Sequence, residues 1–265
     1  MSGPRLLLLL AFLCATLPRA SAQYTDEVQP LADKARSLRS MSGAPRVVYI
    51  GDSHTVGTFG REIDSMLRSA YPVWKIETYA SCGSSPSWFL PGNAASGHIS
   101  ACGTWFHRYD PKDPARLESL TAAAPTPLIG TLLAAHPDTV IVALGANMAD
   151  WNKGGIFGLD SALALARAIA AGGARCAWIG PPDAAGHMPA DQAKAQVARL
   201  NDDLRRTVGG SCAYVQSRTA YDRSWPDPMK MHYPPDAAKA WARQVGAPLR
   251  RVLGPTGVPA AGPSD

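Results

Sequence analysis

The fold is decided by the stretch Arg46-Val47-Val48-Tyr49-Ile50-Gly51-Asp52-Ser53-His54. After Arg46, the residues Val47 to Ile50 form a short apolar run rich in β-branched residues, which is typical of a strand buried on both faces. A helical pattern begins near Phe59, so Ser53 is expected in a turn from a strand to a helix. Backbone N–H groups at a helix start lack partners, so this turn can expose a hydroxyl and also donate to an anionic oxygen. Asp-Ser before a helix is equally ordinary capping chemistry, and the motif alone does not separate these interpretations.

The rest of the chain alternates short apolar runs with longer helical patterns. Further strands are expected at 74–79, 139–144, 176–179 and 212–215, and helices at 59–70, 126–135, 161–171, 190–208 and 236–252. Strands that alternate with helices indicate a parallel sheet covered on both faces. The segment 83–125 is rich in Gly, Ser, Pro and aromatic residues, and its length predicts an irregular, substrate-facing lobe.

Three further residues follow predicted strands or precede the last predicted helix. Asn147, in Gly145-Ala146-Asn147, comes directly after a strand, where its amide can donate to a developing oxyanion. Gly83 follows an earlier strand, and its N–H can donate to the same oxygen. His232 precedes the last helix and suits the role of a base that takes a proton from a serine hydroxyl near neutral pH. Taken singly, each also fits an ordinary structural role as a turn residue or a histidine near a helix start.

The order of these elements along the chain resembles the SGNH/GDSL hydrolase family of esterases and acetylesterases, over about residues 46–241. The resemblance implies a flavodoxin-like three-layer α/β/α sandwich with a parallel sheet and no cofactor. It implies that Ser53 is the nucleophile and His232 the base. The oxyanion hole would then be formed by the N–H groups of Ser53 and Gly83 and by the side chain of Asn147.

The orienting carboxylate departs from the family's pattern. The family usually places its aspartate three residues before the histidine, and that position is Met229 here. Asp227 lies five residues before His232 and reaches it if the turn at Pro228 bulges. Asp222 is the alternative carboxylate, and a Ser–His dyad without any carboxylate is the third possibility. In a Ser-His-Asp triad, loss of the carboxylate costs on the order of 10⁴ in rate.

The cysteines predict two disulfides. Cys82, Cys102, Cys176 and Cys212 remain after removal of the predicted signal peptide, and an even number in an exported chain indicates disulfide pairing. Three pairings are possible, and proximity along the chain favours Cys82–Cys102 and Cys176–Cys212. A zinc site is the alternative, but the sequence contains no Cys-x-x-Cys and no His pair at ligand spacing. No metal is therefore expected.

The N-terminal residues predict export. Arg5 precedes the apolar run 6–13, and the small residues 20–22 supply a cleavage site, which is the pattern of a secretory signal peptide over residues 1–22. The run is too short for a stable membrane anchor. Cys14 follows Leu13, where a lipoprotein signal requires a small residue. We therefore expect a periplasmic or secreted protein.

The mature chain is expected to form one domain over 23–253 and a disordered, Gly/Pro/Ala-rich tail over 254–265. The formal net charge of +5 falls to +3 without Arg5 and Arg19, and no Lys/Arg run interleaved with aromatics indicates nucleic-acid binding. The sequence thus predicts a monomeric, exported serine esterase acting through an acyl-enzyme on a small ester or an acylated carbohydrate. O-acetyl groups of a polysaccharide or peptidoglycan are the expected esters, and acyl transfer would use the same site. The alternative is an SGNH-fold carbohydrate-binding protein of the cell envelope with weak or no catalytic activity.

Overall fold

The computed structural model describes residues 43–92 and 96–254. The predicted signal peptide over 1–22 lies outside the described residues, and so does the predicted tail over 254–265 apart from Gly254. Both stay predictions. In the part of the chain that the structure describes, no helix is both long and apolar enough to cross a membrane.

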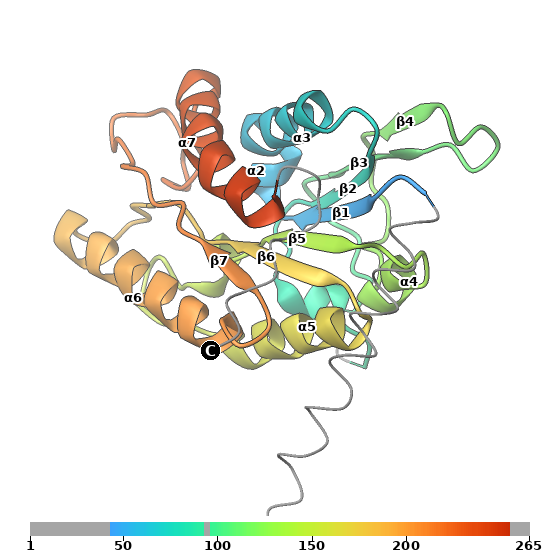
Figure 1. The fold of residues 1–265 in the computed structure, drawn as a ribbon. Helices are drawn as coiled ribbons and strands as arrows, with labels where there is room; N and C mark the ends of the chain where they lie inside the picture. Colours follow the sequence, from blue (N-terminus) through green and yellow to red (C-terminus); the bar gives the residue numbers. More distant parts are fainter. Residues whose placement is uncertain (1–42, 93–95, 255–265) are drawn as a thin grey trace, which may run out of the picture. The chain divides into compact units, whose positions relative to one another are not determined.

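A mixed sheet forms the centre of the described domain (Figure 1). Its strands run in the order β4-β3-β2-β1-β5-β6-β7. They are β1 (Arg46–Gly51), β2 (Lys75–Ser81), β3 (Thr104–Tyr109), β4 (Leu117–Leu120), β5 (Thr139–Ala143), β6 (Arg175–Ile179) and β7 (Ala213–Val215). The five strands β2-β1-β5-β6-β7 are parallel. Counted along the chain these five follow the order 2-1-3-4-5 of flavodoxin-like sheets, which confirms the predicted fold class.

Helices cover both faces of this sheet (Figure 1). One face carries α3 (Thr58–Ala70) and α7 (Pro235–Leu253), and the other carries α4 (Ile129–Leu133), α5 (Leu159–Ala171) and α6 (Ala190–Val208). The short elements are α2 (Ser53–Val56), η1 (Pro86–Phe89) and η2 (Ala146–Met148). Successive residues of a strand point to opposite faces. Accordingly Val47 and Tyr49 pack with α3 and α7, whereas Val48 and Ile50 pack with α5 and α6.

The helix predicted over 126–135 is shorter than expected. It begins only at Ile129, because Thr126 is held in a loop where its hydroxyl lies 2.9 Å from Ser81 Oγ and 2.9 Å from the carbonyl oxygen of His98. Pro127 also disfavours a helical backbone at the residue before it.

The prediction of an irregular lobe over 83–125 is wrong for its second half. Strands β3 and β4 lie there and extend the sheet: β3 pairs antiparallel with β2, and β4 pairs antiparallel with β3. A buried carboxylate on α3 fixes this hairpin: Asp64 accepts from Thr78 Oγ1 at 2.6 Å and from Arg68, and it lies 2.7 Å from His107 Nδ1. The contact with His107 joins residues 43 positions apart in the sequence, so local pattern did not indicate it.

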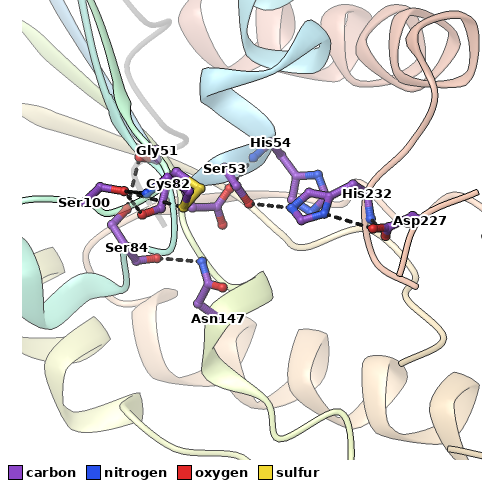
Figure 2. The surroundings of a disulfide bond; sticks show 11 residues. Gly51, Ser53, His54, Cys82, Ser84, Ser100, Asn147, Asp227 and His232 are labelled. Atoms are coloured by element: carbon purple, nitrogen blue, oxygen red, sulfur yellow. Dashed lines mark hydrogen bonds and ion pairs between the residues drawn. A yellow bond between two sulfur atoms is a disulfide. The ribbon is translucent and has the colours of Figure 1, made fainter. Parts of the chain in front are cut away.

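Both predicted disulfides are confirmed. Cys82 pairs with Cys102, at a Cα–Cα distance of 5.5 Å, and closes the loop between β2 and β3. Cys176 in β6 pairs with Cys212, which immediately precedes β7, at 4.4 Å. The first bond borders the edge of the sheet where the candidate site residues gather (Figure 2).

Candidate active site

Ser53 is the first residue of α2 and directly follows the turn at the end of β1. Asp52 caps this helix, since its side chain accepts from His54 N at 3.0 Å. A Cβ on Gly51 would lie 1.9 Å from Thr55 Oγ1, so only glycine allows the strand to turn this tightly into the helix. The capping interpretation therefore holds for Asp52, and the same turn leaves the Ser53 side chain partly exposed at the sheet edge.

His232 reaches Ser53 from the far end of the chain. Its Nε2 lies 3.0 Å from Ser53 Oγ, which is within hydrogen-bonding distance (Figure 2). His232 sits in the loop before α7, and its side chain is 37 % exposed. Ser53 and His232 are thus both partly exposed to solvent, so a ligand can reach them.

Asp227 is the carboxylate that faces the other imidazole nitrogen. Its Oδ1 lies 3.5 Å from His232 Nδ1, an ion-pair distance somewhat longer than a good hydrogen bond (Figure 2). The loop closes around this carboxylate: Oδ2 accepts from the backbone N–H groups of Met231 and His232 at 2.6 Å, and Oδ1 accepts from Met229 at 3.2 Å. Partial burial raises the pKa of Asp227, but these N–H donors outweigh it and hold the pKa below its usual value.

The loop conformation explains how a spacing of five residues suffices. Lys230 N donates to Asp227 O at 3.1 Å, closing a turn that has Pro228 at its second position. Lys230 itself has a φ of +54°, which reverses the chain and brings His232 back over the carboxylate. Asp222 lies elsewhere, where its Oδ1 accepts from Ser224 N at 2.9 Å, and no contact with His232 is found for it within the described residues.

Asn147 and Gly83 lie at the ends of the two strands that flank β1. Asn147 follows β5 in η2, and its Nδ2 donates to the carbonyl of Ser84 at 2.9 Å (Figure 2). Ser84 Oγ in turn donates to the carbonyl of Gly51 at 3.1 Å, so the ends of β1, β2 and β5 are joined. Gly83 has a φ of +80°, a left-handed conformation that favours glycine. An amide nitrogen carries two hydrogens, so Asn147 keeps one for a further acceptor.

Asp52 also links two of these turns, a role that the sequence analysis missed. Burial raises its pKa to about 7, while hydrogen bonds from the N–H groups of His54 and Ala146 act in the opposite direction. Only 2 % of the residue is exposed. The Asp52 carboxyl therefore ties the turn of Ser53 to the turn of Asn147. The sequence signal for this role is the aspartate of the Gly-Asp-Ser motif, which directly follows a buried strand.

His54 is buried next to His232. Its ring centroid lies 5.4 Å from that of His232 and 5.2 Å from that of Trp241, edge-on. Burial lowers the pKa of His54 to about 3, and the neighbouring charge of His232 acts in the same direction. A neutral His54 therefore supports the His232 ring by packing.

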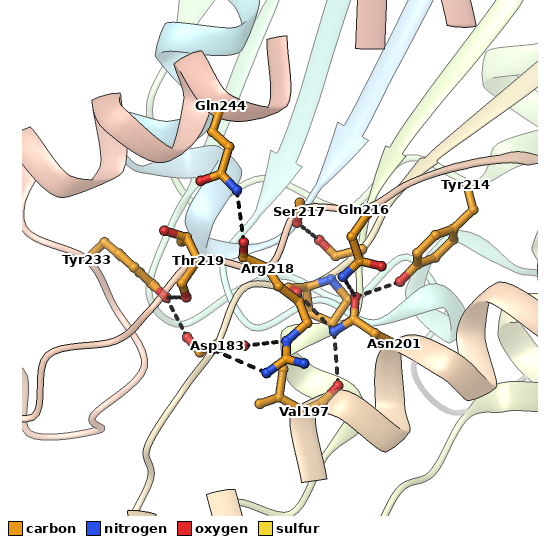
Figure 3. Close-up of polar contacts among 12 residues, drawn as sticks. Asp183, Val197, Asn201, Tyr214, Gln216, Ser217, Arg218, Thr219, Tyr233 and Gln244 are labelled. Atoms are coloured by element: carbon orange, nitrogen blue, oxygen red, sulfur yellow. Dashed lines mark hydrogen bonds and ion pairs between the residues drawn. The ribbon is translucent and has the colours of Figure 1, made fainter. Parts of the chain in front are cut away.

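Aromatic residues hold the His232 loop in place. The Tyr233 hydroxyl lies 2.7 Å from the carbonyl oxygen of Asp183 and 2.8 Å from that of Thr219 (Figure 3). Tyr221 packs edge-on against Tyr233, and its hydroxyl lies 3.4 Å from Asp227 Oδ2. These tyrosines have no motif in the sequence, because their roles arise from loops that meet only in the folded chain.

Comparisons with known proteins agree with this architecture. No protein-family model matches the sequence, and the curated proteins include no significant match. Among solved structures, a catalytic mutant of an acetylxylan esterase from Geobacillus stearothermophilus is 12 % identical with a TM-score of 0.52; the match covers 83 % of this chain and 99 % of that one. Another mutant from that genus, described as an acetyl-xylooligosaccharide esterase, is 13 % identical with a TM-score of 0.50, covering 80 % and 95 %. A provisionally assigned SGNH hydrolase from Slackia heliotrinireducens is 15 % identical with a TM-score of 0.49, covering 80 % and 100 %.

Identities of 12 % and 13 % show a shared fold. The chain therefore has the α/β fold of these hydrolases, as its sheet order indicates and as the sequence predicted. At these identities the likeness establishes the fold and not the activity of the site.

Proposed function

We propose that this chain is an exported serine esterase of the SGNH type that hydrolyses carboxylic esters. The observation that carries the proposal is the 3.0 Å contact between Ser53 Oγ and His232 Nε2 at the carboxyl edge of the sheet. A hydroxyl is a weak nucleophile until a positioned base accepts its proton, and an imidazole in this place is such a base. Two disulfides fit an exported protein and support the predicted signal peptide.

The first half of the reaction forms an acyl-enzyme. Ser53 Oγ attacks the acyl carbon while His232 Nε2 accepts the hydroxyl proton, and the carbonyl π bond becomes an oxyanion. The Ser53 and Gly83 N–H groups and the Asn147 amide donate to that oxyanion; a donor of this kind is worth about 3 kcal/mol in acyl transfer. The carbon–oxygen bond to the alcohol then breaks, and His232 returns the proton to the leaving alkoxide.

The second half releases the acid. A water molecule gives a proton to His232 and attacks the acyl carbon. The bond from that carbon to Ser53 Oγ then breaks, and His232 returns the proton to Oγ, which restores the hydroxyl and releases the acid. Asp227 holds the imidazole with Nδ1 protonated, which leaves Nε2 free to accept a proton. Because the contact is 3.5 Å, this orienting role is weaker than in a triad with a short hydrogen bond.

The proposed esters are O-acetyl groups on a glycan. Esterases with this fold are described as acting on acetylated xylan and its oligosaccharides, and their chemistry is the one proposed here. The alternative is a carbohydrate-binding protein with the same fold and little activity, which the long contact between Asp227 and His232 favours.

A fluorophosphonate probe and p-nitrophenyl acetate separate the two functions. We expect the probe to label the folded wild type, and Ser53→Ala to abolish labelling and to lower kcat by about 10³ or more. Ser65→Ala removes an exposed hydroxyl from α3 and serves as the matched control that keeps both signals. Absence of labelling and of ester hydrolysis in folded wild type would instead establish the binding protein.

A further inference from the structure

A cavity of about 250 Å³ adjoins the loops that hold His232. Tyr221 forms part of its wall, and the hydroxyl of Tyr221 lies 3.4 Å from Asp227 Oδ2. Ala185 forms another part, and its N–H donates to the carbonyl of Lys230 at 2.8 Å, two residues before His232. A ligand in this cavity would therefore touch the same loops that position the imidazole.

The residues that line the cavity carry a net positive charge. Lys194 on α6 and Arg223 both line it, and both are exposed to solvent. Among the described residues that line this wall, Asp183 is the one carboxylate, and Arg218 already neutralises it through contacts of 2.8 Å and 3.4 Å (Figure 3). Lys194 and Arg223 thus face the cavity without an opposing charge in its wall.

Neighbouring groups keep this charge in place. The Arg223 guanidinium donates to the carbonyl of Met188 at 2.5 Å, which fixes one end of its planar fork. Lys230 Nζ lies 3.3 Å from the carbonyl oxygen of Arg223, so a further cation stands next to the wall. Three carboxylates lie near the wall but are not among its lining residues. Asp222 accepts from the N–H of Ser224 and keeps its negative charge, Asp227 faces His232, and Asp191 lies in the first turn of α6.

The remaining wall suits a sugar ring. Most of it is alanine, with the ring of Tyr221 beside it, and such apolar surfaces pack against the C–H faces of sugars. The lining alanines are Ala184, Ala185, Ala190, Ala193 and Ala220. The volume lies just below that of pockets for drug-sized ligands and matches a small unit such as one sugar.

We propose that this cavity binds a carboxylate-bearing sugar unit of the acylated glycan, so that acidic rather than neutral glycans are its ligands. This inference rests on the proposed function in that the ligand is taken to be an acylated glycan. The acidic character of that glycan is inferred from the positively charged cavity wall alone. The carboxylate belongs either to the sugar ring itself, as in a uronic acid, or to a lactyl or peptide group attached to an amino sugar, as in peptidoglycan.

Binding measured by NMR titration of the mature full-length chain tests the proposal without requiring catalysis. The probes are trigalacturonate for a ring carboxylate, muramyl dipeptide for a lactyl or peptide carboxylate, and xylotriose as the neutral glycan. We expect one acidic probe to bind more tightly than xylotriose. Its affinity should fall as salt rises from about 0.02 M to about 0.5 M, since exposed charges are screened.

Substitutions of the charged residues in the wall test whether the acidic probe binds in this cavity. Lys194→Gln and Arg223→Gln should each weaken the acidic probe about two- to fivefold relative to xylotriose, as expected for exposed ion pairs. Arg223→Lys keeps the charge and should retain most of the affinity. Lys112→Gln removes an exposed positive charge from the β3–β4 turn at the other edge of the sheet and should change nothing.

The outcomes separate this inference from the proposed function. If neither acidic probe exceeds xylotriose, or if Lys194→Gln and Arg223→Gln behave like Lys112→Gln, the cavity proposal is wrong even when p-nitrophenyl acetate is hydrolysed. If the acidic probe binds in a Lys194- and Arg223-dependent manner but the wild type hydrolyses no ester, the cavity proposal stands and the esterase proposal fails.

Discussion

The substitution Asp227→Asn tests how His232 is oriented, and the structure defines what the change would do. Both short contacts of the carboxylate, from the N–H groups of Met231 and His232 at 2.6 Å, involve Oδ2. An asparagine has one accepting oxygen and one donating NH₂ group. The rotamer that keeps both short contacts therefore places Nδ2 where Oδ1 was, 3.5 Å from His232 Nδ1 and 3.2 Å from Met229 N.

This rotamer has two consequences of different size. It loses the contact with Met229 N and the charge on the acceptor, and hydrogen bonds to charged groups are worth about 1.5–3 kcal/mol, so the free energy of unfolding should fall by about that amount. It also points a donor at His232 Nδ1, which favours the tautomer with the proton on Nε2. That tautomer cannot accept the Ser53 proton, and we expect kcat/KM to fall by about 10²–10⁴.

The comparison with Asp227→Ala isolates the tautomer effect. Alanine removes all three backbone contacts but imposes no wrong tautomer. Stability should therefore decrease in the order wild type, Asp227→Asn, Asp227→Ala, whereas activity should decrease in the order wild type, Asp227→Ala, Asp227→Asn. Urea unfolding and hydrolysis of p-nitrophenyl acetate measure the two orders. A carboxylate that only stabilises the loop would give the same order in both.

Asp222→Asn is the matched control, because this exposed carboxylate accepts from Ser224 in its own turn. It should change the free energy of unfolding by less than about 0.5 kcal/mol and activity by less than about twofold. The reasoning is refuted if Asp227→Asn stays within tenfold of wild-type kcat/KM, and such a result would establish a Ser–His dyad.

Three further predictions concern the same edge of the sheet. Asn147→Ala should lower kcat about 10²–10³-fold with little change in KM, because the oxyanion contact is made mainly in the transition state; a rise in KM alone would contradict this role. The raised pKa of Asp52 means that its folded form binds a proton more tightly than the unfolded chain, so its contribution to stability is full below about pH 4 and is lost as pH rises to about 7. Asp52→Asn should therefore gain roughly 2–3 kcal/mol in unfolding free energy relative to wild type between about pH 5 and about pH 8, and a difference that does not vary with pH would refute the buried ionisable carboxyl. Replacing both Cys82 and Cys102 by serine opens a loop of 20-residue separation and should cost about 3 kcal/mol in urea unfolding, whereas equal stability of the two proteins would show the bond to be unimportant.

The parallel core could be predicted from the sequence because the patterns that indicate its strands and helices are local. The apolar runs of β1 and β5 and the helical patterns between strands each occupy one continuous segment. The β3–β4 hairpin could not be predicted in this way. Its place at the sheet edge depends on Asp64, which contacts His107 from 43 residues away.

The same difference between local and long-range information applies to the residues in and around the candidate site. Ser53, Gly83 and Asn147 each follow a strand, and strand ends at one edge of a parallel sheet meet by geometry, so the order of motifs sufficed to bring them together. The cavity charge had no such signal, since Lys194 on α6 and Arg223 in a later loop become neighbours only through the folding of both segments.

Asp227 shows why counting residues between a histidine and its carboxylate is a weak guide to geometry. The distance between the two side chains is set by how the intervening loop closes. Here the loop closes on the carboxylate itself, through three backbone N–H groups and the left-handed conformation of Lys230. The two additional residues form part of the turn and do not move Asp227 away from His232, so the carboxylate still faces Nδ1 at 3.5 Å. The Asp227 variants test how strongly a carboxylate at this distance orients the imidazole.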